Sequence, residues 1–462
     1  MFTVRQLIEA SSADLVQGDV QKRIKGICID SRRANPGDCF IAIKGSSFDG
    51  HDFIAQAIKN GASCAIVSIL NPKLLSSNPK YKRISILNVD DTIRALGKIA
   101  AFHRQRFSIP VIAVTGSNGK TTTKEMLAHV LSARMRVLRT EGTKNNNIGV
   151  PLTLLNLKST HDIAVVELGT NHFGEIEYLS GICRPNMAVI TNIAASHLEF
   201  LRDLNGVFTE KTSLLRLLQK PAIAILNADD KFLYKLISGR KYRHTVVSFG
   251  VRSRADFRGS AIELRGEESR FLLNFKHRFM LKNCGQHNIH NALSAIAVAR
   301  IFGLSHKDII SKLASFKFPA GRCSMAKFGG LRLIDDTYNS NPFSLEHALY
   351  ALANIKVKGR RIFVMGDMLE LGPDREFLHG KAGRLAAKIC DTLIAVGPLS
   401  GKALREAKKS GMKEKDLFSC ADSGQAGKIL LGKIQPCSQD AVLVKGSRAM
   451  KMEEIINNLK QK

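Results

Sequence analysis

VTGSNGKTTTKEM, residues 114–126, contains the G-x-x-G-K-T-T pattern of a phosphate-binding loop. The apolar run VIAVT at 111–115 precedes it, and apolar residues follow at helical spacing from Met126 to Leu131. The loop is therefore expected to join a buried strand to a helix. The usual signature, G-x-x-x-x-G-K-[ST], would place a glycine where this chain has Val114, so the sequence predicts a shortened cradle.

Strand, glycines and helix together are what a phosphate cradle requires. Glycines let backbone N–H groups approach an anion, and the N-terminus of a helix adds partial positive charge. We expect Lys120 to reach the β- and γ-phosphates of a nucleotide and Thr121 to offer its hydroxyl to Mg²⁺. The alternative is a glycine-rich turn that binds nothing, but the strand before it and the helix after it favour phosphate binding.

Short, almost wholly apolar runs recur along the chain after this point. VIAVT, IAVVEL, MAVIT and AIAIL form one series, and RLID, RIFVM, TLIAV and AVLV form a second. Separated by helix-length segments, such runs are typical of buried strands in parallel α/β sheets. The chain of 462 residues thus predicts an α/β protein with three domains. They are a smaller α/β domain at 1–108, a central parallel-sheet mononucleotide-binding domain at 109–317 and a doubly wound, Rossmann-like domain at 318–462.

The charge of the chain is strongly positive. Lys and Arg number 69 and Asp and Glu 40, which leaves a formal charge of +29 and raises nucleic acid as a partner. The positive residues, however, form no long basic block, Trp is absent and aromatic residues make up only 6%. These features count against base-stacking platforms, and we expect no nucleic-acid partner, although the charge alone does not decide. A basic enzyme that handles polyanionic small molecules fits the charge equally well.

Cysteine usage and hydropathy indicate the compartment. The nine cysteines are scattered singly without a C-x-x-C pair, which predicts reduced thiols and neither a disulfide framework nor a thiolate zinc site. The start, MFTVRQLIEASSAD, has no apolar run of signal-peptide length, and no segment approaches the roughly 18 apolar residues of a membrane span. We expect a cytoplasmic, monomeric protein without a membrane span.

The loop T-G-S-N-G-K-T-T-T-K resembles the ATP site of the Mur ligases, the amide-forming enzymes of peptidoglycan precursor synthesis, a family that uses a tight cradle of its own. Further family signatures follow in order from about residue 27 to residue 455. Segments 225–230, 285–299, 316–322 and 334–345 are similar to the family's nucleotide-binding segments. The ATP-binding residues that the resemblance implies are Gly116, Ser117, Asn118, Gly119, Lys120, Thr121, Thr122, Asn227, His287, Asn288, Asn291, Arg322 and Asp336.

Two segments resemble the family's magnesium-binding signatures. VVELGTNHFGEI, residues 165–176, implies Glu167 as a ligand, and TNIAASHLEF, residues 191–200, implies His197 as a ligand of a second ion. An isolated histidine is more often a structural residue, because Mg²⁺ prefers oxygen ligands. Together with Thr121, the resemblance implies two Mg²⁺ sites.

GVFTEKTSLL, residues 206–215, resembles the family's helix with a carbamylated lysine, which implies N-carboxylysine at Lys211 and a further metal ligand there. Addition of CO₂ needs a neutral amine, so the pKa of this lysine has to be lowered by burial or by nearby cations. A solvated helical lysine is the alternative for an isolated E-K-T. The family's usual Gly-Ser is replaced here by Arg202 and Asp203, so the turn before this helix is expected to differ.

Substrate contacts are implied by several segments. ICIDSRR, within residues 27–62, resembles the family's uridine-nucleotide domain, and residues 140–157 resemble the substrate loop of the dipeptide-adding branch, although Thr143 stands where that branch usually has Asn. A solvated arginine and an Asn-rich turn are the plain alternatives. The substrate-binding residues implied are Ser31, Arg32, Asn145, Asn146, Asn171, His172, Tyr338, Asn339, Lys445, Ser447 and Arg448.

The resemblance implies an ATP-dependent, ADP-forming amide ligase. ATP would phosphorylate the terminal carboxylate of UDP-N-acetylmuramoyl-tripeptide, and the amine of D-Ala-D-Ala would attack the acyl phosphate. The catalytic residues implied are Lys120, Lys211, His197 and Arg322. A sister ligase that adds the third amino acid is an alternative, but N-N-N-I-G and D-D-T-Y-N-S-N-P favour the dipeptide-adding branch. A nucleic-acid-dependent NTPase would need motor signatures, and an inactive scaffold would have lost ligands that this chain retains.

Overall fold

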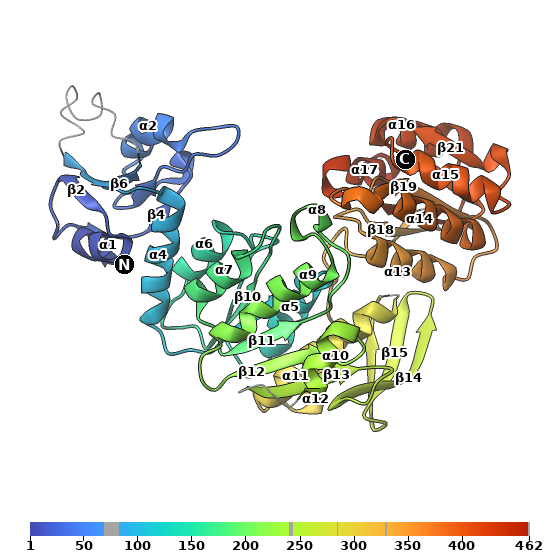
Figure 1. The fold of residues 1–462 in the computed structure, drawn as a ribbon, viewed down its shortest axis with the longest axis horizontal. Helices are drawn as coiled ribbons and strands as arrows, with labels where there is room; N and C mark the ends of the chain where they lie inside the picture. Colours follow the sequence, from blue (N-terminus) through green and yellow to red (C-terminus); the bar gives the residue numbers. More distant parts are fainter. Residues whose placement is uncertain (69–82, 240–243, 284, 329, 461–462) are drawn as a thin grey trace. The chain divides into compact units, whose positions relative to one another are not determined.

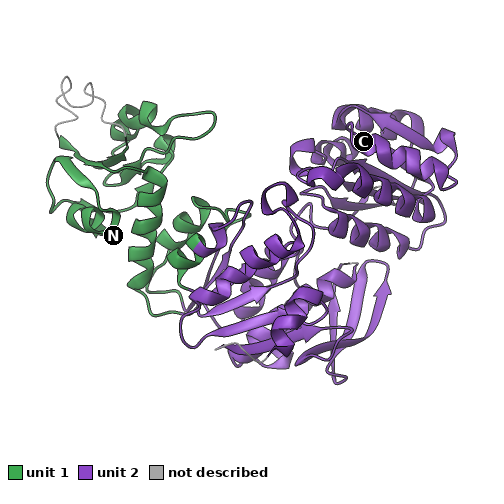
Figure 2. Ribbon diagram, viewed as in Figure 1, with its two compact units in different colours: residues 1–109, 140–161, 178–184 green, residues 110–139, 162–177, 185–462 purple. Residues whose placement is uncertain are grey.

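The computed structural model of the chain describes residues 1–68, 83–239, 244–283, 285–328 and 330–460 (Figure 1). These residues form two compact units, which are coloured separately in Figure 2. Unit 1 comprises residues 1–109, 140–161 and 178–184, and unit 2 comprises residues 110–139, 162–177 and 185–462.

Unit 1 is built on a five-stranded sheet with the order β2-β7-β6-β5-β4. The strands β4 to β7 run parallel, and β2 pairs antiparallel with β7 at one edge. Helix α4 (Thr92–Gln105) is capped by Asp91, whose carboxylate accepts hydrogen bonds from two backbone N–H groups of the first turn. The strands are β2 (Asp14–Gln17), β4 (Ile27–Cys28), β5 (Cys39–Ile41), β6 (Cys64–Val67) and β7 (Ser85–Asn88).

A nine-stranded sheet forms the first half of unit 2, in the order β16-β15-β14-β13-β12-β11-β8-β10-β9. The strands β8 to β13 are parallel, and the four apolar runs of the first series form β8, β10, β11 and β12, as predicted. The strands are β8 (Val111–Thr115), β9 (Val137–Arg139), β10 (Ile163–Glu167), β11 (Met187–Ile190), β12 (Ile223–Asn227), β13 (Thr245–Gly250), β14 (Phe257–Arg265), β15 (Glu268–Leu273) and β16 (His277–Leu281).

The order of these strands decides where a ligand site forms. Strand β8 is flanked by β10 on one side and by β11 on the other. Glu167 is level with Val114 across one ladder, and Ile190 is level with Thr115 across the other. The carboxyl ends of the three strands therefore meet at one edge, which is where open parallel sheets bind ligands.

Helices α5 (Lys120–Leu131) and α11 (Gln286–Ile301) share a core with this sheet. The spacing of Ile289, Leu293 and Ile296 in the sequence predicts an amphipathic helix at 285–299 with these residues inward, and that prediction is wrong. Its residues are buried almost continuously from Asn288 to Ala299, because α5, α12 (His306–Ala314) and strands β12 to β15 all pack against it. Alanines at several positions let these neighbours approach closely.

The second half of unit 2 is a six-stranded sheet with the order β17-β18-β22-β19-β20-β21. Only the edge strand β17 is antiparallel, and apolar cores lie on both faces. Helices α13, α14 and α15 cover one face, and α16 and α17 cover the other, so this part is doubly wound as predicted. The strands are β17 (Ser324–Phe328), β18 (Leu331–Asp336), β19 (Arg361–Gly366), β20 (Thr392–Val396), β21 (Leu417–Cys420) and β22 (Ala441–Lys445), and the helices are α13 (Pro342–Ala353), α14 (Arg375–Ile389), α15 (Ser400–Lys409), α16 (Ser423–Lys428) and α17 (Glu453–Lys460).

The α/β fold class with a central parallel sheet is confirmed. The domain boundaries at residues 108 and 317 stay a prediction. None of the helices in the described ranges has the length and apolar composition that crossing a membrane requires.

Candidate nucleotide-binding and ligase site

The loop between β8 and α5 is shaped by two glycines. Gly116 has φ +143° and Gly119 has φ +81°, and both are packed too tightly for a side chain. A β-carbon on Gly116 would lie 1.9 Å from the hydroxyl oxygen of Thr191, and one on Gly119 would lie 2.5 Å from the amide oxygen of Asn291. The loop is thus a close-fitting cradle that only glycine permits at these positions.

Residues after β11 hold the cradle in place. The N–H of Ser117 donates to the carbonyl of Asn192 at 2.9 Å, and the N–H of Asn118 donates to the side-chain oxygen of Asn192 at 3.0 Å. The side chain of Asn192 also donates to the carbonyl of Asn118 at 3.1 Å, and the hydroxyl of Thr191 donates to the same carbonyl at 2.5 Å. Our interpretation of the sequence missed Asn192, although it lies inside the segment that we singled out for His197.

The first turn of α5 remains available to an anion. Gly119 precedes the helix and cannot cap it with a side chain, so the N–H groups of Lys120, Thr121 and Thr122 have no acceptor within the described parts of the chain. The side-chain nitrogen of Asn118 is buried and also lacks a partner among the described residues. Unpaired buried donors at a helix N-terminus are what a phosphate group requires.

Lys120 folds back over the cradle. Its Nζ donates to the carbonyls of Gly116 at 2.8 Å and Ser117 at 3.3 Å. Burial lowers the pKa of this lysine to about 8, the charge of Glu167 partly opposes that shift, and the charge of Arg322 adds to it. Among the residues that the structure describes, Lys120 therefore has no anionic partner at hydrogen-bond distance, and it is placed to receive phosphate.

Three predicted residues meet at the hydroxyl of Thr121. It donates to Oε1 of the buried Glu167 at 3.1 Å and accepts from Nη2 of Arg322 at 3.1 Å. The guanidinium of Arg322 also lies over the ring of Tyr338, 3.6 Å from its centroid. Burial lowers the pKa of Arg322, which stays charged because arginine titrates far above neutral pH. A hydroxyl and a carboxylate oxygen at this distance are the hard donors that Mg²⁺ prefers.

Lys211 is buried in α9 (Leu204–Thr212), with 1% of its surface exposed. In the part of the chain that the structure describes, its ammonium has no hydrogen-bond or ion-pair partner. Burial lowers the pKa of this lysine well below its usual value, and the charge of Lys120 lowers it further against the opposing effect of Glu210. The environment thus favours a neutral amine, and the alternative of a solvated lysine is wrong.

Glu210, next to it, organises the loop after β10. Its buried carboxylate accepts hydrogen bonds from the N–H groups of Gly174 at 2.7 Å and Ile176 at 2.8 Å. This loop carries the predicted substrate residues Asn171 and His172, both exposed. Sequence reasoning missed Glu210, whose only signal was a carboxylate beside the candidate lysine.

His197 lies just before α8 (Leu198–Leu201) and has a left-handed backbone with φ +53°. Its Nδ1 is 2.6 Å from Oε2 of Glu370, and this hydrogen bond lowers the pKa of Glu370. Among the described residues, no group of three or more His, Cys, Asp or Glu side chains is arranged to hold a metal ion. The second predicted magnesium site therefore stays a prediction.

The predicted nucleoside residues line the start of α11 and the end of β12. Asn291 donates to Asn288 at 3.1 Å and accepts from the hydroxyl of Thr123 in α5 at 3.2 Å. Asn227 donates to the carbonyl of Thr191 at 2.9 Å. The four asparagine and threonine side chains thus tie α11 and β12 to the cradle.

His287 and Asn288 each have a buried polar atom that is available to a ligand. Nδ1 of His287 and the side-chain nitrogen of Asn288 are buried without partners among the described residues. Burial lowers the pKa of His287 to about 3, and the charges of His347 and Lys445 lower it further, so the imidazole is neutral at physiological pH. A neutral ring beside unpaired polar atoms suits the uncharged base of a nucleotide.

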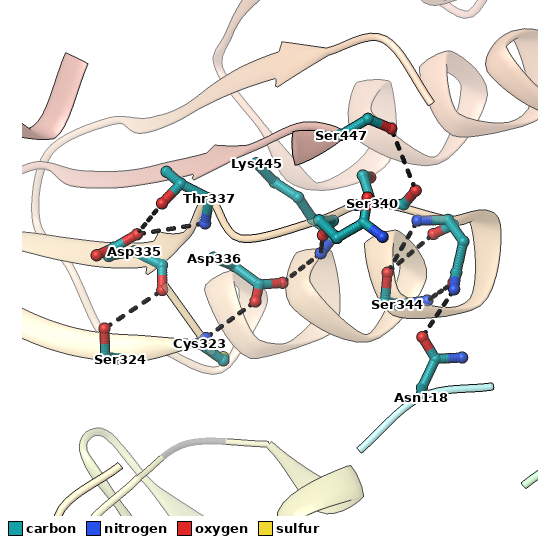
Figure 3. A network of polar contacts seen from close by, with 12 residues as sticks. Asn118, Cys323, Ser324, Asp335, Asp336, Thr337, Ser340, Ser344, Lys445 and Ser447 are labelled. Carbon is teal, nitrogen blue, oxygen red and sulfur yellow. Dashed lines mark hydrogen bonds and ion pairs between the residues drawn. The ribbon is translucent and has the colours of Figure 1, made fainter. Parts of the chain in front are cut away.

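Figure 3 shows the polar network at the carboxyl ends of β18 and β22. Asp336 accepts from the N–H of Cys323 at 2.9 Å and from Nζ of Lys445 at 2.5 Å, and the same Nζ donates to the carbonyl of Asn339 at 2.9 Å. Lys445 is buried, with 1% of its surface exposed. Its charge is therefore neutralised by Asp336 in this structure.

The same network reaches the phosphate cradle. Asn341 caps α13 and donates from its side-chain nitrogen to the side-chain oxygen of Asn118 at 2.8 Å (Figure 3). The hydroxyl of Ser447 donates to the carbonyl of Ser340 at 3.5 Å and accepts from the N–H of Leu369 at 2.9 Å. Sequence reasoning missed Asn341, which sits inside the N-S-N-P segment that we quoted.

The other predicted substrate residues lie apart from these contacts. Arg448 is exposed and pairs with Glu453 at 2.9 Å, with its guanidinium 5.9 Å from the ring centroid of Tyr338. In unit 1, the exposed Arg32 forms a two-pronged ion pair with Asp30, which also caps the short helix that contains Ser31. The binding roles of Arg448, Arg32 and Ser31 therefore stay predictions.

Asn145 and Asn146 belong to unit 1 and precede α6 (Gly149–Leu155). The side-chain oxygen of Asn146 accepts from the N–H groups of Ile148 at 3.2 Å and Gly149 at 2.9 Å, which is the turn-forming behaviour expected of asparagine. Asn145 is half-buried.

Three family models match the chain and together span most of it. Residues 23–104 match the Mur ligase family catalytic domain, residues 114–299 match the Mur ligase middle domain, and residues 321–448 match the Mur ligase glutamate ligase domain.

Full-length relatives match as well. The chain is 36% identical to the UDP-N-acetylmuramoyl-tripeptide--D-alanyl-D-alanine ligase of Escherichia coli, over 99% of this chain and 98% of that one. A crystal structure of MurF from Acinetobacter baumannii superposes with a TM-score of 0.89 at 35% identity, covering 100% of this chain and 99% of that one. MurF ligase from Thermotoga maritima in complex with ADP superposes with a TM-score of 0.82 at 28% identity, covering 96% and 99%.

Proposed function

This chain belongs to the Mur ligase family, and from that premise we infer that it is an ATP-dependent, ADP-forming peptide ligase of peptidoglycan precursor synthesis. It joins D-alanyl-D-alanine to UDP-N-acetylmuramoyl-tripeptide, the reaction named for its full-length relatives. One observation links this assignment to particular residues. Glu167 and Arg322 both bond to the hydroxyl of Thr121 at the head of α5, beside the unpaired N–H groups of the cradle.

The reaction needs two transfers. An oxygen of the tripeptide's terminal carboxylate attacks the γ-phosphorus of ATP, and the bond to the β–γ bridging oxygen breaks to release ADP. The amine of the dipeptide then attacks the acyl carbon, a C–N bond forms, the amine loses a proton and phosphate leaves. Phosphoryl transfer depends on positioning and charge neutralisation, and this explains a site made of cations, hard oxygen donors and backbone N–H groups.

We assign the phosphate groups to the head of α5. Its first-turn N–H groups and the side chain of Asn118 supply neutral donors, and Lys120 supplies positive charge. Arg322 lies at hydrogen-bond distance from Thr121, so its guanidinium adds positive charge where the γ-phosphate oxygens become more negative. Asn227, His287, Asn288, Asn291 and Asp336 hold the nucleoside in this proposal.

Mg²⁺ fits the donor set around Thr121. The hydroxyl of this residue and the carboxylate of Glu167 would hold one ion, and His197 and carboxylated Lys211 would hold a second. When bound, Mg²⁺ neutralises the charge of the phosphate oxygens during transfer. Arg322 shares the Thr121 hydroxyl in this structure and would have to release it to the ion.

N-carboxylation of Lys211 is supported by its surroundings. The nitrogen lone pair of a neutral lysine attacks CO₂, a C–N bond forms and one proton is lost, which leaves a carbamate with one negative charge. Burial, and then the nearby charge of Lys120, lower the pKa of Lys211 well below its usual value, which favours the neutral amine that this attack needs. The product would replace a buried amine by a carboxylate that can serve as a metal ligand.

The charge of the whole chain suits its substrates. ATP and the UDP-sugar peptide are both multiply anionic, and the formal charge of +29 attracts them. We place the substrate contacts at the eleven residues named from the sequence and the enzyme in the cytoplasm as a monomer. Lys445 acts in this proposal by holding Asp336 and the loop at Asn339 in place.

Phosphate release measured with purified protein, Mg·ATP and UDP-N-acetylmuramoyl-tripeptide tests the assignment. D-Ala-D-Ala should stimulate release strongly, and an equal concentration of L-Ala-L-Ala should not. Formation of the UDP-pentapeptide is followed in the same samples by mass spectrometry. Release that is independent of the dipeptide, or stimulated equally by a single amino acid, would remove the specific assignment.

A further inference from the structure

Two residues with large side chains adopt left-handed backbone and face each other within unit 2. His197 has φ +53° and ψ +34°, and Glu370 has φ +60°. This conformation is uncommon for residues other than glycine, although histidine, asparagine and aspartate adopt it more often than other residues do. Their side chains meet with 2.6 Å between Nδ1 of His197 and Oε2 of Glu370.

The loop that carries Glu370 is held firmly. The N–H of Met368 donates to Nε2 of His379 at 2.9 Å, and the N–H of Leu369 donates to the hydroxyl of Ser447 at 2.9 Å. A β-carbon on Gly372 would lie 3.9 Å from the backbone of Glu199, so the loop also passes close to the segment after His197. The backbone just before Glu370 is therefore held in place.

The chemistry of the pair selects one form of the imidazole. A carboxylate accepts hydrogen bonds and donates none, so in the neutral ring the hydrogen has to sit on Nδ1. The lone pair is then on Nε2, which has no hydrogen-bond partner in the described ranges of the chain. A free imidazole side chain prefers the opposite tautomer, with hydrogen on Nε2, so Glu370 reverses the ordinary preference.

We propose that Glu370 is a positioning residue that holds His197 as the Nδ1–H tautomer, with the Nε2 lone pair directed to the ligand of this histidine. The proposal rests on the proposed function for the identity of that ligand, a magnesium ion. Carboxylates play this part behind many metal-binding histidines, where they fix both the ring orientation and the tautomer.

The tautomer is measured directly in the ligand-free protein. Protein labelled with ¹⁵N only at histidine gives long-range ¹H–¹⁵N NMR spectra in which the two ring nitrogens are distinguished, and His197→Asn identifies the signal among those of the 13 histidines. Three variants are compared with the unmodified chain. Glu370→Leu removes the acceptor, Glu370→Gln keeps an amide oxygen that can accept, and Glu199→Leu removes an exposed carboxylate two residues from His197.

The unmodified chain, Glu370→Gln and Glu199→Leu should show hydrogen on Nδ1, and Glu370→Leu should shift to hydrogen on Nε2. Phosphate release is then measured at increasing Mg²⁺ concentrations. Glu370→Leu should raise the Mg²⁺ concentration needed for half-maximal release about tenfold or more, which is the usual effect of losing a carboxylate behind a metal-binding histidine. Glu370→Gln should need a Mg²⁺ concentration close to that of the unmodified chain. Melting temperatures verify that the variants fold.

Other outcomes overturn the proposal. Hydrogen on Nε2 in the unmodified chain, or protons on both nitrogens at pH 8, contradicts the tautomer. A tautomer that Glu370→Leu leaves unchanged contradicts the positioning role. A shifted tautomer with unchanged magnesium dependence separates Glu370 from the metal and leaves the ligase assignment intact, because that assignment is read from dipeptide-dependent product.

Discussion

Gly119 lies so close to Asn291 that a β-carbon would stand 2.5 Å from the amide oxygen of that side chain. The contact joins the phosphate cradle to the first turns of α11, and φ +81° at Gly119 turns the chain into α5. Adding one methyl group at this position therefore tests whether the shape of the cradle matters for nucleotide binding.

Gly119→Ala should raise the KM for ATP about tenfold or more, because a misplaced donor set loses on the order of 1.4 kcal/mol of binding. Gly303→Ala is the matched control. Gly303 has nearly the same φ, +79°, but a β-carbon there meets nothing within 4 Å. It should lower the melting temperature slightly and leave the KM for ATP unchanged. Equal effects of the two substitutions on that KM would attribute the result to backbone strain alone.

The lowered pKa of Lys120 predicts a pH dependence. Burial lowers this pKa from 10.5 to about 8, so the free enzyme loses the lysine charge as the pH rises above about 8. kcat/KM for ATP should fall above that pH, whereas kcat at saturating ATP should stay level, because bound phosphate stabilises the charged lysine. A level kcat/KM between pH 7 and pH 10 would contradict this role for Lys120.

The same shift has a consequence for stability. Between about pH 8 and the usual value of 10.5, the unfolded chain binds more protons at Lys120 than the folded chain does. Its contribution to the free energy of unfolding therefore increases with pH across that window. This pH dependence of the free energy of unfolding is expected for the protein without ATP. Lys120→Met should lack it and is the control in urea unfolding.

Activity should depend on dissolved CO₂ through Lys211. Protein kept in CO₂-free buffer should lose activity, and bicarbonate should restore it, since the buried neutral amine reacts with CO₂. ¹³C NMR with ¹³CO₂ should show one carbamate signal that is missing from Lys211→Ala. The control is Lys231→Ala, which removes an exposed lysine at the start of α10 (Lys231–Ser238). Activity that is indifferent to CO₂, with no carbamate signal, would refute the modification.

Arg202 occupies a strained turn. Its φ is +68° and its ψ is −67°, and the N–H of Asp203 donates to the carbonyl of Leu201 at 2.8 Å, which closes a γ-turn of the rare positive-φ kind. The Mur ligases usually have glycine in this region, so this chain combines a side chain with a backbone that glycine adopts more easily.

Arg202→Gly should therefore increase the free energy of unfolding by about 0.5–1 kcal/mol, the relieved strain being partly offset by the greater freedom of glycine in the unfolded chain. Arg202→Ala keeps the β-carbon and should give no such gain. Urea unfolding with an unchanged m-value measures both. A gain of the same size in both variants would show that the arginine side chain, and not the turn, carries the cost.

Much of the fold follows from local pattern. The runs VIAVT, IAVVEL, MAVIT and AIAIL became β8, β10, β11 and β12, because a strand buried on both faces has to be apolar throughout. The cradle was also predictable, since glycines, lysine and threonine at fixed spacing lie between a strand and a helix. Helix α11 was misjudged because its helix and sheet neighbours bury it on nearly every side, and sequence periodicity cannot reveal that.

The contacts that complete the site were not predictable in the same way. Asn341 and Asn118 are 223 positions apart, and His197 and Glu370 are 173 positions apart. Each pair joins loops from the two halves of unit 2, and a contact between segments so far apart in the sequence leaves no local pattern. The burial of Lys211 is similar, because a nine-residue helix with few apolar residues gives no sign of the face that it buries.

In the proposed reaction, the carboxylate of the sugar peptide is activated by the γ-phosphate of ATP held at the head of α5. This step is followed with UDP-N-acetylmuramoyl-tripeptide that carries ¹⁸O in its terminal carboxylate, and the released phosphate is analysed by mass spectrometry after one turnover. Activation through an acyl phosphate predicts one ¹⁸O atom in each phosphate and none in the ADP. Phosphate that carries no ¹⁸O, formed together with the pentapeptide product, would contradict the account.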